Sequence, residues 1–217
     1  MIIAVLGTGS VGETIASRLV EVGHSVVMGS RSATNEKATA WVAKTGDRAG
    51  QGTFAEAIGA GELIILATKG ETGLEAIGSA QADAVAGKTI IDVSNPLDFS
   101  SGMPPSLSTV NTDSFGEKLQ RTFPAANVVK SLNTMWAGLM VNPALVADGD
   151  HTVFMSGNNA GAKAQTADLL RQFGWKAENI LDLGDISTAR GTEMLLPIWL
   201  RTWGVLGTGA FNFKVVQ

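Results

Sequence analysis

A glycine-rich turn near the start of the chain constrains the fold more than any other feature. An apolar run over residues 2–6 leads into this turn, and a helical pattern over residues 10–22 follows it. In such a turn the first glycine permits a tight bend, the second lets the backbone approach a pyrophosphate, and the third allows close helix–strand packing. The pyrophosphate then lies on free N–H groups at the helix N-terminus. The residues predicted to form this dinucleotide-binding turn are Gly7, Thr8, Gly9, Ser10, Val11 and Gly12.

The end of the next predicted strand indicates which dinucleotide binds. Residues 25–28 form an apolar run, and Gly29, Ser30 and Arg31 follow it. An NAD site has Asp or Glu at this place, where the carboxylate binds the ribose 2′-hydroxyl. A carboxylate would repel a 2′-phosphate, whereas a guanidinium pairs with it through two hydrogen bonds. We therefore expect NADP(H), held by Ser30 and Arg31.

Composition restricts the class of protein. The chain has 217 residues, of which 45% are hydrophobic and 17% charged, with 16 basic and 20 acidic residues and a net charge of −4. These values are typical of a globular protein, and without a basic run we expect no nucleic-acid partner. The most apolar stretch, residues 194–206, contains Pro197 and Arg201 and is shorter than the ~20 residues that cross a bilayer. We expect no signal peptide, no membrane partner and a cytoplasmic location.

Several residue types are scarce or missing, and this excludes some chemistry. With no Cys, the chain has no thiol nucleophile and no zinc–thiolate site. With no Tyr, it lacks the Tyr–Lys pair of short-chain dehydrogenases. Only His24 and His151 are present, and few groups that could act together with either lie nearby in the sequence. We expect both histidines to be structural and no metal to be bound.

Apolar and amphipathic segments alternate along the chain. Predicted strands lie at residues 2–6, 25–28, 50–53, 63–67, 89–93, 127–132, 152–155 and 179–183. Predicted helices lie at residues 10–22, 35–44, 54–58, 71–80, 115–121, 136–141 and 160–173, with a helical C-terminus. A Ser-, Gly- and Pro-rich loop is expected over residues 94–114. This order predicts an α/β fold with a Rossmann-type, doubly wound, mostly parallel sheet. We divide it into an NADP(H)-binding domain, 1–185, and a small helical C-terminal portion, 186–217.

Residues at strand ends are the candidates for ligand binding, because ligands of open α/β sheets bind beyond the carboxyl ends of the strands. Thr68 and Lys69 follow one strand, Asn95 the next and Asn133 another. Apart from Lys69 and Lys130, this set offers hydrogen bonding and apolar contact more than acid–base chemistry. Such a site suits direct hydride transfer between two stacked rings, where positioning matters more than proton transfer.

At this point the chain resembles the NADPH-dependent reductases of the deazaflavin coenzyme F420 and their bacterial dinucleotide-binding relatives. The matching segments are 7–12, 29–31, 92–97, 128–134, 154–158, 182–184 and 193–197, with a related C-terminal ending. Archaeal members carry His at the place of Asn133 and a Pro-containing segment at the place of Thr68-Lys69-Gly70. Both departures lie on the acceptor side of the expected cleft.

The resemblance implies roles for individual residues. Those implied to bind NADP(H) are Thr8, Gly9, Ser10, Val11, Ser30, Arg31, Lys37, Thr68, Asn95, Pro96, Leu97 and Ala137, and Lys69 joins them as a strand-end candidate. Those implied to face the second ring are Asn133, Met135, Trp136, Leu206 and Gly207. No residue is assigned as an acid or base.

These inferences predict a soluble NADP-dependent oxidoreductase that transfers hydride between NADP(H) and a flavin-type or deazaflavin (F420) ring, its small-molecule co-substrate. Two alternatives remain: a non-catalytic NADP(H)-binding sensor, and an NADPH-dependent flavin or ferric reductase. A dehydrogenase of the hydroxyisobutyrate type would need a larger helical domain than this chain provides. The segment Leu195–Phe213 is so apolar that one sheet cannot cover it, and we expect part of it to form a homodimer interface.

Overall fold

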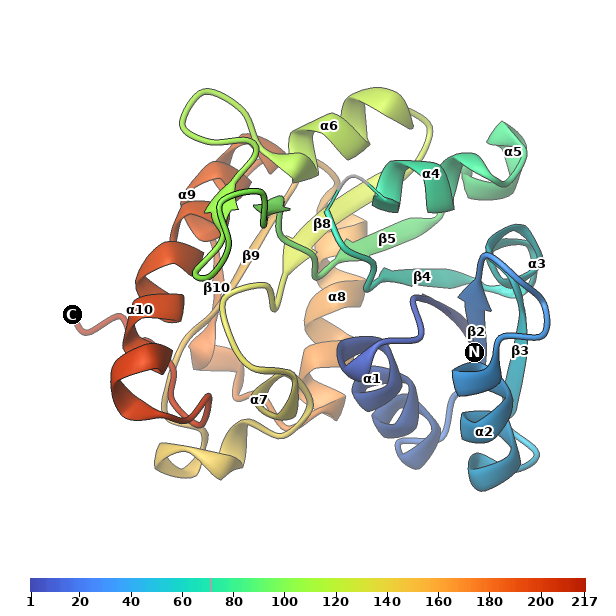
Figure 1. Ribbon diagram of the computed structural model, residues 1–217, viewed down its shortest axis with the longest axis horizontal. Coiled ribbons are helices and arrows are strands. Elements are labelled where there is room, and N and C mark those ends of the chain that lie inside the picture. The colour runs from blue at the N-terminus through green and yellow to red at the C-terminus, as the bar shows by residue number, and fades with distance from the viewer. Residues whose placement is uncertain (71) are drawn as a thin grey trace.

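The computed structural model describes residues 1–70 and 72–217, and its centre is an eight-stranded sheet (Figure 1). The strands lie in the order β10-β9-β8-β5-β4-β1-β2-β3. Their bounds are β1 Ile2–Leu6, β2 Ser25–Ser30, β3 Ala49–Thr53, β4 Leu63–Leu66, β5 Thr89–Asp92, β8 Asn127–Ser131, β9 Val153–Gly157 and β10 Ile180–Asp182. β4 and β5 are buried on both faces, and the uninterrupted apolar sequence of β4 predicts this. The predicted doubly wound α/β fold is confirmed.

One strand pairing departs from the parallel arrangement. β9 pairs with β8 in the antiparallel sense, and β10 then pairs with β9 in parallel. The remaining pairings in this sheet are parallel. The carboxyl ends of β1, β2, β3, β4, β5 and β8 therefore lie at one edge of the sheet, whereas β9 and β10 point their ends the other way. Only the first group can contribute to a cleft at that edge.

Helices cover both faces of the sheet and create two hydrophobic cores (Figure 1). One core receives side chains from α1 Ser10–Glu21, α2 Glu36–Thr45, α7 Ala137–Val141 and α8 Ala160–Gln172. The other receives them from α3 Phe54–Ala60, α4 Thr72–Gly78, α5 Ala82–Val85, α6 Phe115–Thr122 and α9 Ala189–Met194. The predicted helix over 71–80 begins in α4 at Thr72, and residue 71 lies outside the described residues.

The C-terminal segment is less helical than its composition suggests. α10 spans Leu196–Leu206 and ends at Gly207, whose left-handed backbone (φ +68°) stops the helix. Residues 207–217 are not helical, which corrects the expectation of a helix over the whole apolar segment. They instead run back to the start of β9, where Thr152 donates its N–H to the Phe213 carbonyl at 3.0 Å.

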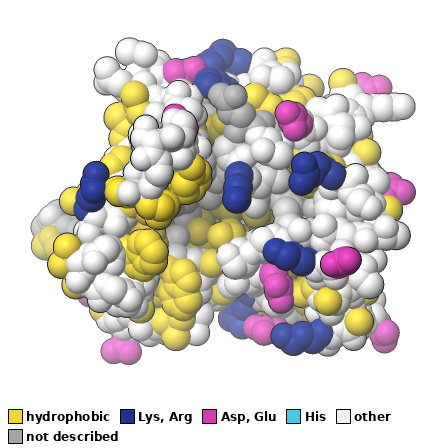
Figure 2. Space-filling model, in the orientation of Figure 1, with side chains coloured by type: hydrophobic (Ala, Val, Ile, Leu, Met, Phe, Trp, Pro, Cys, Tyr) yellow, Lys and Arg dark blue, Asp and Glu magenta, His cyan; other side chains and the backbone are white. Residues whose placement is uncertain are grey.

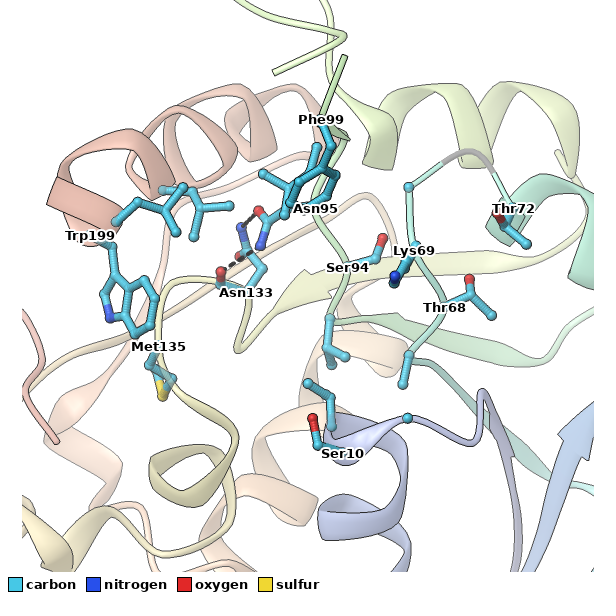
Figure 3. A pocket seen from close by; sticks show the side chains of 18 of the residues that line it. Ser10, Thr68, Lys69, Thr72, Ser94, Asn95, Phe99, Asn133, Met135 and Trp199 are labelled. Atoms are coloured by element: carbon cyan, nitrogen blue, oxygen red, sulfur yellow. Dashed lines mark hydrogen bonds between the residues drawn. The ribbon is translucent and has the colours of Figure 1, made fainter. Parts of the chain in front are cut away.

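The loop predicted over 94–114 contains a small ribbon. β6 Leu97–Asp98 pairs with β7 Ser106–Leu107 in the antiparallel sense. The Ser108 N–H also donates to the Pro96 carbonyl at 2.8 Å. The ribbon lies above the carboxyl end of β5 and forms one rim of the cleft described next (Figure 3).

Candidate functional site

The glycine turn between β1 and α1 forms one end of the site, and its three glycines meet different surroundings. Gly7 has a φ of +124°, and a Cβ there would lie 2.5 Å from the Ala67 carbonyl oxygen. A Cβ on Gly12 would lie 2.0 Å from the Gly7 oxygen. A Cβ on Gly9 would meet nothing within 4 Å. The fold therefore requires glycine at the first and third positions, and Gly9 leaves space in front of the helix.

The N-terminus of α1 is open to an anion. Gly9 is its N-cap, and no side chain caps the first N–H groups of the helix. Ser10 and Val11 follow, and both line the main cleft with Gly9. Uncapped N–H groups at the positive end of a helix dipole are suited to a pyrophosphate. This geometry fits the dinucleotide expected from the sequence.

A second, smaller cavity lies at the carboxyl end of β2. Its volume is about 210 Å³, and its lining residues are Ser30, Arg31, Thr53, Phe54, Ala55, Thr72, Glu75 and Ser79. The Ser30 hydroxyl donates to the Ser32 carbonyl at 2.6 Å and accepts from the Ser32 N–H. Arg31 is exposed, so its guanidinium can turn toward a phosphate. Lys37 is also exposed, in the first turn of α2, and does not line this cavity.

The main cleft has a volume of about 680 Å³ and runs from the glycine turn toward α10 (Figure 3). Its middle is polar and includes Thr68, Lys69, Ser94 and Asn95. Its far end is apolar and is lined by Met135, Met140, Leu196, Trp199 and Leu200. Figure 2 shows the same division at the surface, with apolar side chains gathered around the hollow on the side of α10. The cleft can therefore hold a polar group and an aromatic ring side by side.

Two amide side chains join the polar and apolar parts. Asn133 donates from Nδ2 to the Asn95 Oδ1 at 2.9 Å and to the Thr192 carbonyl at 3.2 Å. Asn95 donates from Nδ2 to the Asn133 carbonyl at 2.8 Å. Asn133 is buried, and both N–H bonds of its amide are used within the protein. It therefore positions the two walls of the cleft, a role that the sequence pattern did not reveal.

Thr68 offers an unused polar group. Its Oγ1 is buried and has no hydrogen-bond partner among the described residues. A buried hydroxyl without a partner is costly, and this one belongs to a residue that lines the middle of the cleft. A ribose hydroxyl or a carboxamide placed there would satisfy it, and this fits the nicotinamide half of NADP(H).

Charged groups are few in this part of the molecule. Lys69 and Asp98 are the charged side chains among the described residues that line the main cleft. Lys130 lies behind the wall of the cleft and is fully buried. Burial alone would lower the pKa of Lys130, but the carboxylates of Asp92 and Glu193 outweigh that effect and raise the pKa. Lys130 thus keeps its proton and is not the acid–base group that the sequence suggested.

Both histidines are held within the fold. His24 contacts the Gln172 side chain at 2.7 Å through Nε2. His151 contacts the Pro143 carbonyl at 2.9 Å and the Asn212 side chain at 2.7 Å. Neither lines the main cleft. In the part of the chain that the structure describes, no three His, Cys, Asp or Glu side chains are grouped as metal ligands.

Some predicted site residues lie away from the main cleft. The Trp136 side chain is half exposed and covers Gly138 and Gly209, and Leu206 and Gly207 lie at the far end of α10. None of these three lines the cleft, nor do Pro96 and Ala137. Leu97 does line it. Trp199, within the apolar segment Leu195–Phe213, was not predicted to line the site, yet it does so and presents its ring beside Met135 (Figure 3).

The parallel sheet, the glycine turn and the cleft at the strand ends define a Rossmann-type dinucleotide-binding protein. Residues 2–96 match the family model described as NADP oxidoreductase, coenzyme F420-dependent. A crystal structure from Arthrobacter sp. FB24, provisionally described as an F420-dependent NADP-reductase, is 50% identical, with a TM-score of 0.93 and coverage of 99% of both chains. The chain belongs to this family of NADP oxidoreductases.

Other relatives widen the comparison. Metalloreductase STEAP3 of Rattus norvegicus is 34% identical over 91% of this chain and 37% of its own length. Metalloreductase STEAP2 of Homo sapiens is 29% identical over 89% of this chain and 35% of its own length. The chain thus spans little more than a third of these curated relatives. A reductive aminase from Aspergillus terreus in complex with NADPH has a TM-score of 0.67 at 19% identity, covering 94% of this chain and 62% of its own, and shares the fold.

Among the described residues, no helix combines the length and the apolar character that crossing a bilayer would require.

Proposed function

We propose that this oxidoreductase transfers a hydride between NADP(H) and a flavin or deazaflavin (coenzyme F420) ring, which binds as a co-substrate in the apolar end of the main cleft. The observation that carries the proposal is the division of the cleft. Its polar middle suits a nicotinamide, and its apolar end, lined by Trp199 and Met135, suits a second ring (Figure 3).

The chain's own residues would bind and orient NADP(H). The N–H groups after Gly9 hold the pyrophosphate, and Arg31 pairs with the 2′-phosphate. Thr68 and the residues after β5 fix the nicotinamide side. Bound NADPH supplies the hydride, so the protein needs no nucleophile of its own.

The apolar end would orient the second ring and exclude water. Met135, Leu196 and Trp199 offer flat or flexible apolar surface on which a fused ring can lie. Holding two rings face to face converts an encounter in solution into a reaction within one complex. Lys69 is the one basic side chain among the described residues that line the cleft, so it favours an acceptor that becomes more negative on reduction.

The test is anaerobic oxidation of NADPH with FMN, coenzyme F420 and a ferric chelate in parallel. We expect oxidation with at least one of the two ring acceptors. Trp199→Ala should lower acceptor turnover by raising KM for the ring, while calorimetric NADPH affinity stays unchanged. Trp203→Ala is the matched control, because Trp203 stacks on Trp199 at 6.4 Å but does not line the main cleft. The proposal fails if NADPH binds and neither ring oxidises it.

A second candidate function is ferric reduction, which the 34% identity to Metalloreductase STEAP3 favours. A hydride carries two electrons and a ferric ion accepts one, so a flavin would accept the pair and release single electrons. The ferric chelate is therefore tested with and without FMN. Reduction that requires both NADPH and FMN supports this route, and reduction without FMN argues against it.

We also propose that the chain forms a homodimer through the exposed apolar face of α10 and the residues after it. Trp203, Val205 and Leu206 are exposed there. A patch of this character commonly marks an interface, and a two-fold dimer is the most frequent closed assembly. We infer that a second copy of this chain covers this exposed apolar face.

A further inference from the structure

A fully buried cluster of three charged side chains lies directly behind the main cleft. The Lys130 Nζ is 2.7 Å from the Asp92 Oδ2 and 2.8 Å from the Glu193 Oε1. It also donates to the Ser94 carbonyl at 2.8 Å. An ammonium has three N–H bonds, and here all three have a partner within the protein.

Every oxygen of the two carboxylates also has a partner within the protein. The Asp92 Oδ1 accepts from the Ser94 N–H at 2.9 Å and from the Ser94 hydroxyl at 2.7 Å. Glu193 accepts from the N–H groups of Phe115 and Gly116, at 2.8 and 3.1 Å, at the start of α6. The three side chains are buried and each of their polar atoms has a partner within the protein, so the cluster must act indirectly.

The cluster joins elements that form opposite walls of the cleft. Asp92 ends β5, and the adjoining Ser94 and Asn95 line the polar middle. Glu193 lies in α9, and α10 follows α9 after one residue with Leu196 and Trp199 at the apolar end. Lys130, in β8, bonds to both groups. A displacement of α9 would therefore move the apolar wall relative to Ser94.

A second set of bonds runs parallel to the first. Asn133 lies two residues after the end of β8, and it bonds to Asn95 after β5 and to the Thr192 carbonyl in α9. Thr192 is the neighbour of Glu193. The end of β5, the end of β8 and α9 are thus joined twice, once by charged side chains and once by amides. The amide bonds of Asn95 and Asn133 lie between the polar and apolar parts of the cleft (Figure 3).

Stability alone does not account for such a cluster. Replacing a buried ion pair or triad by neutral side chains is often neutral or stabilising, because burial removes the charges from water. What the cluster supplies is a fixed distance, since Lys130 cannot leave either carboxylate without stranding a buried charge. A rigid distance is what hydride transfer between two bound rings requires, and a displacement of about 1 Å can cost 100-fold in rate.

We propose that Lys130 and Glu193 are positioning residues, which set the separation between the NADP(H) side of the cleft and its acceptor side. This inference rests on the proposed function, because it concerns the distance between the two rings. Neither residue touches a substrate. Weakening the bonds of Lys130 to Asp92 and Glu193 changes the rate of hydride transfer within the complex. It changes NADP(H) affinity little, since the glycine turn and Arg31, which bind the phosphates, lie outside the elements that the cluster joins.

The test compares Glu193→Gln with Arg190→Met. Arg190 lies in the same short helix and pairs with Glu117 of α6 through bonds of 2.6 and 2.9 Å, so its loss also loosens α9 from α6. It has no bond to β5 or β8 among those described. Each full-length variant is mixed anaerobically with NADPH, or with NADPH deuterated at C4, and with FMN or coenzyme F420 at saturating concentrations. The single-turnover rate, its isotope effect and the NADPH Kd are measured.

Glu193→Gln should slow hydride transfer by about 10- to 100-fold, with an isotope effect that depends more strongly on temperature. Its NADPH Kd should stay within about twofold of the wild type. Arg190→Met should leave both quantities unchanged. Equal single-turnover rates in wild type and Glu193→Gln would overturn the proposal.

A second variant covers the case in which Glu193→Gln does not fold. The triple change Asp92→Asn, Lys130→Met and Glu193→Gln removes all three charges, so no buried charge is left alone. It should bind NADPH normally and show the same slow transfer. A folded triple variant with the wild-type rate would overturn the proposal.

Hydrogen exchange of backbone amides tests this inference without relying on hydride transfer, so it can be judged separately from the proposed function. If the wild type reduces neither ring, the proposed function fails, and the link is judged by the exchange of amides in 94–97 and 189–200. Faster exchange in both segments of Glu193→Gln, and only in the second segment of Arg190→Met, supports the link. Unchanged exchange in 94–97 overturns it.

Discussion

Gly9 and Gly12 belong to one motif, yet as single residues they differ in whether the fold leaves room for a side chain. Gly12 packs so closely on the Gly7 carbonyl that no Cβ fits, whereas the space beside Gly9 is open. The backbone of Gly9 is also extended, with a φ of −81°, which a side chain can adopt. The space beside Gly9 is therefore available to a ligand, whereas glycine at position 12 is required by the fold.

We predict that Gly9→Val leaves the free protein folded and abolishes measurable NADPH binding, because the new side chain fills the space of the pyrophosphate. Gly12→Ala should instead lower the melting temperature strongly. Thermal unfolding with and without NADPH measures both effects. Tight NADPH binding by a folded Gly9→Val variant would exclude the assigned phosphate site.

Arg31 tests the choice of dinucleotide. We expect Arg31→Ala to weaken NADPH binding by about 1.5–3 kcal/mol, the range of a hydrogen bond to a charged group. NADH affinity should change little, because NADH has no 2′-phosphate. Calorimetric titration of both coenzymes provides the measurement, and equal losses for the two would contradict the assignment.

At the scale of the element, the pairing of α6 with α9 predicts a pH dependence of stability. The Arg190 guanidinium, helped by the Ser114 hydroxyl, holds the pKa of Glu117 below its ordinary value of 4.5 although burial opposes this. A carboxyl whose pKa is lower in the folded state stabilises that state at pH values above the unfolded pKa. This contribution is lost as the pH falls through the folded pKa.

The corresponding variant is Glu117→Gln. We expect it to be less stable than the wild type at pH 7 and to approach the wild type below about pH 4.5. Urea unfolding at pH 7, 5, 4 and 3 measures the difference. A difference that stays constant down to pH 3 would show that the charge of Glu117 does not stabilise the fold.

Helix α10 shows why an element's bounds depend on more than apolar composition. The segment remains apolar to Phe213, but Gly207 adopts a left-handed conformation and ends the helix. The next residues then turn back, so that Phe211 stacks on Trp199 of α10 at 5.4 Å and the Phe213 carbonyl accepts from the Thr152 N–H beside β9. Apolar content predicts burial, whereas the helix end depends on backbone conformation and on what the following residues can contact.

At the scale of the whole molecule, the proposed homodimer can be tested on the exposed end of α10. We expect Leu206→Glu to convert a dimer into a monomer while NADPH binding is retained, because a charge would be buried in an apolar interface. Leu145→Glu is the control, since both side chains are 54% exposed and Leu145 lies outside this face. Light scattering at micromolar concentration gives the mass, and a monomeric wild type would remove the proposal.

The doubly wound sheet and the ends of most strands followed from local patterns. The run Leu63–Leu66 is apolar without interruption and had to lie in the middle of a parallel sheet. The glycine turn and the missing acid after β2 likewise depend on neighbours in the sequence, and they predicted a nucleotide-binding protein. Thr68, Lys69, Asn95 and Asn133 were identified because strand ends meet at one edge, and the structure brings these four to one cleft.

Other features came only from the tertiary structure, because they depend on residues that are distant along the chain. The antiparallel β9 and the contribution of Trp199 to the cleft are of this kind. So is the role of Lys130, which resembles an acid–base candidate in the sequence until Asp92 and Glu193 enclose it. Local sequence determines what a segment can form and which groups it offers. Long-range packing decides which of those groups still face a ligand once the partners of each are in place.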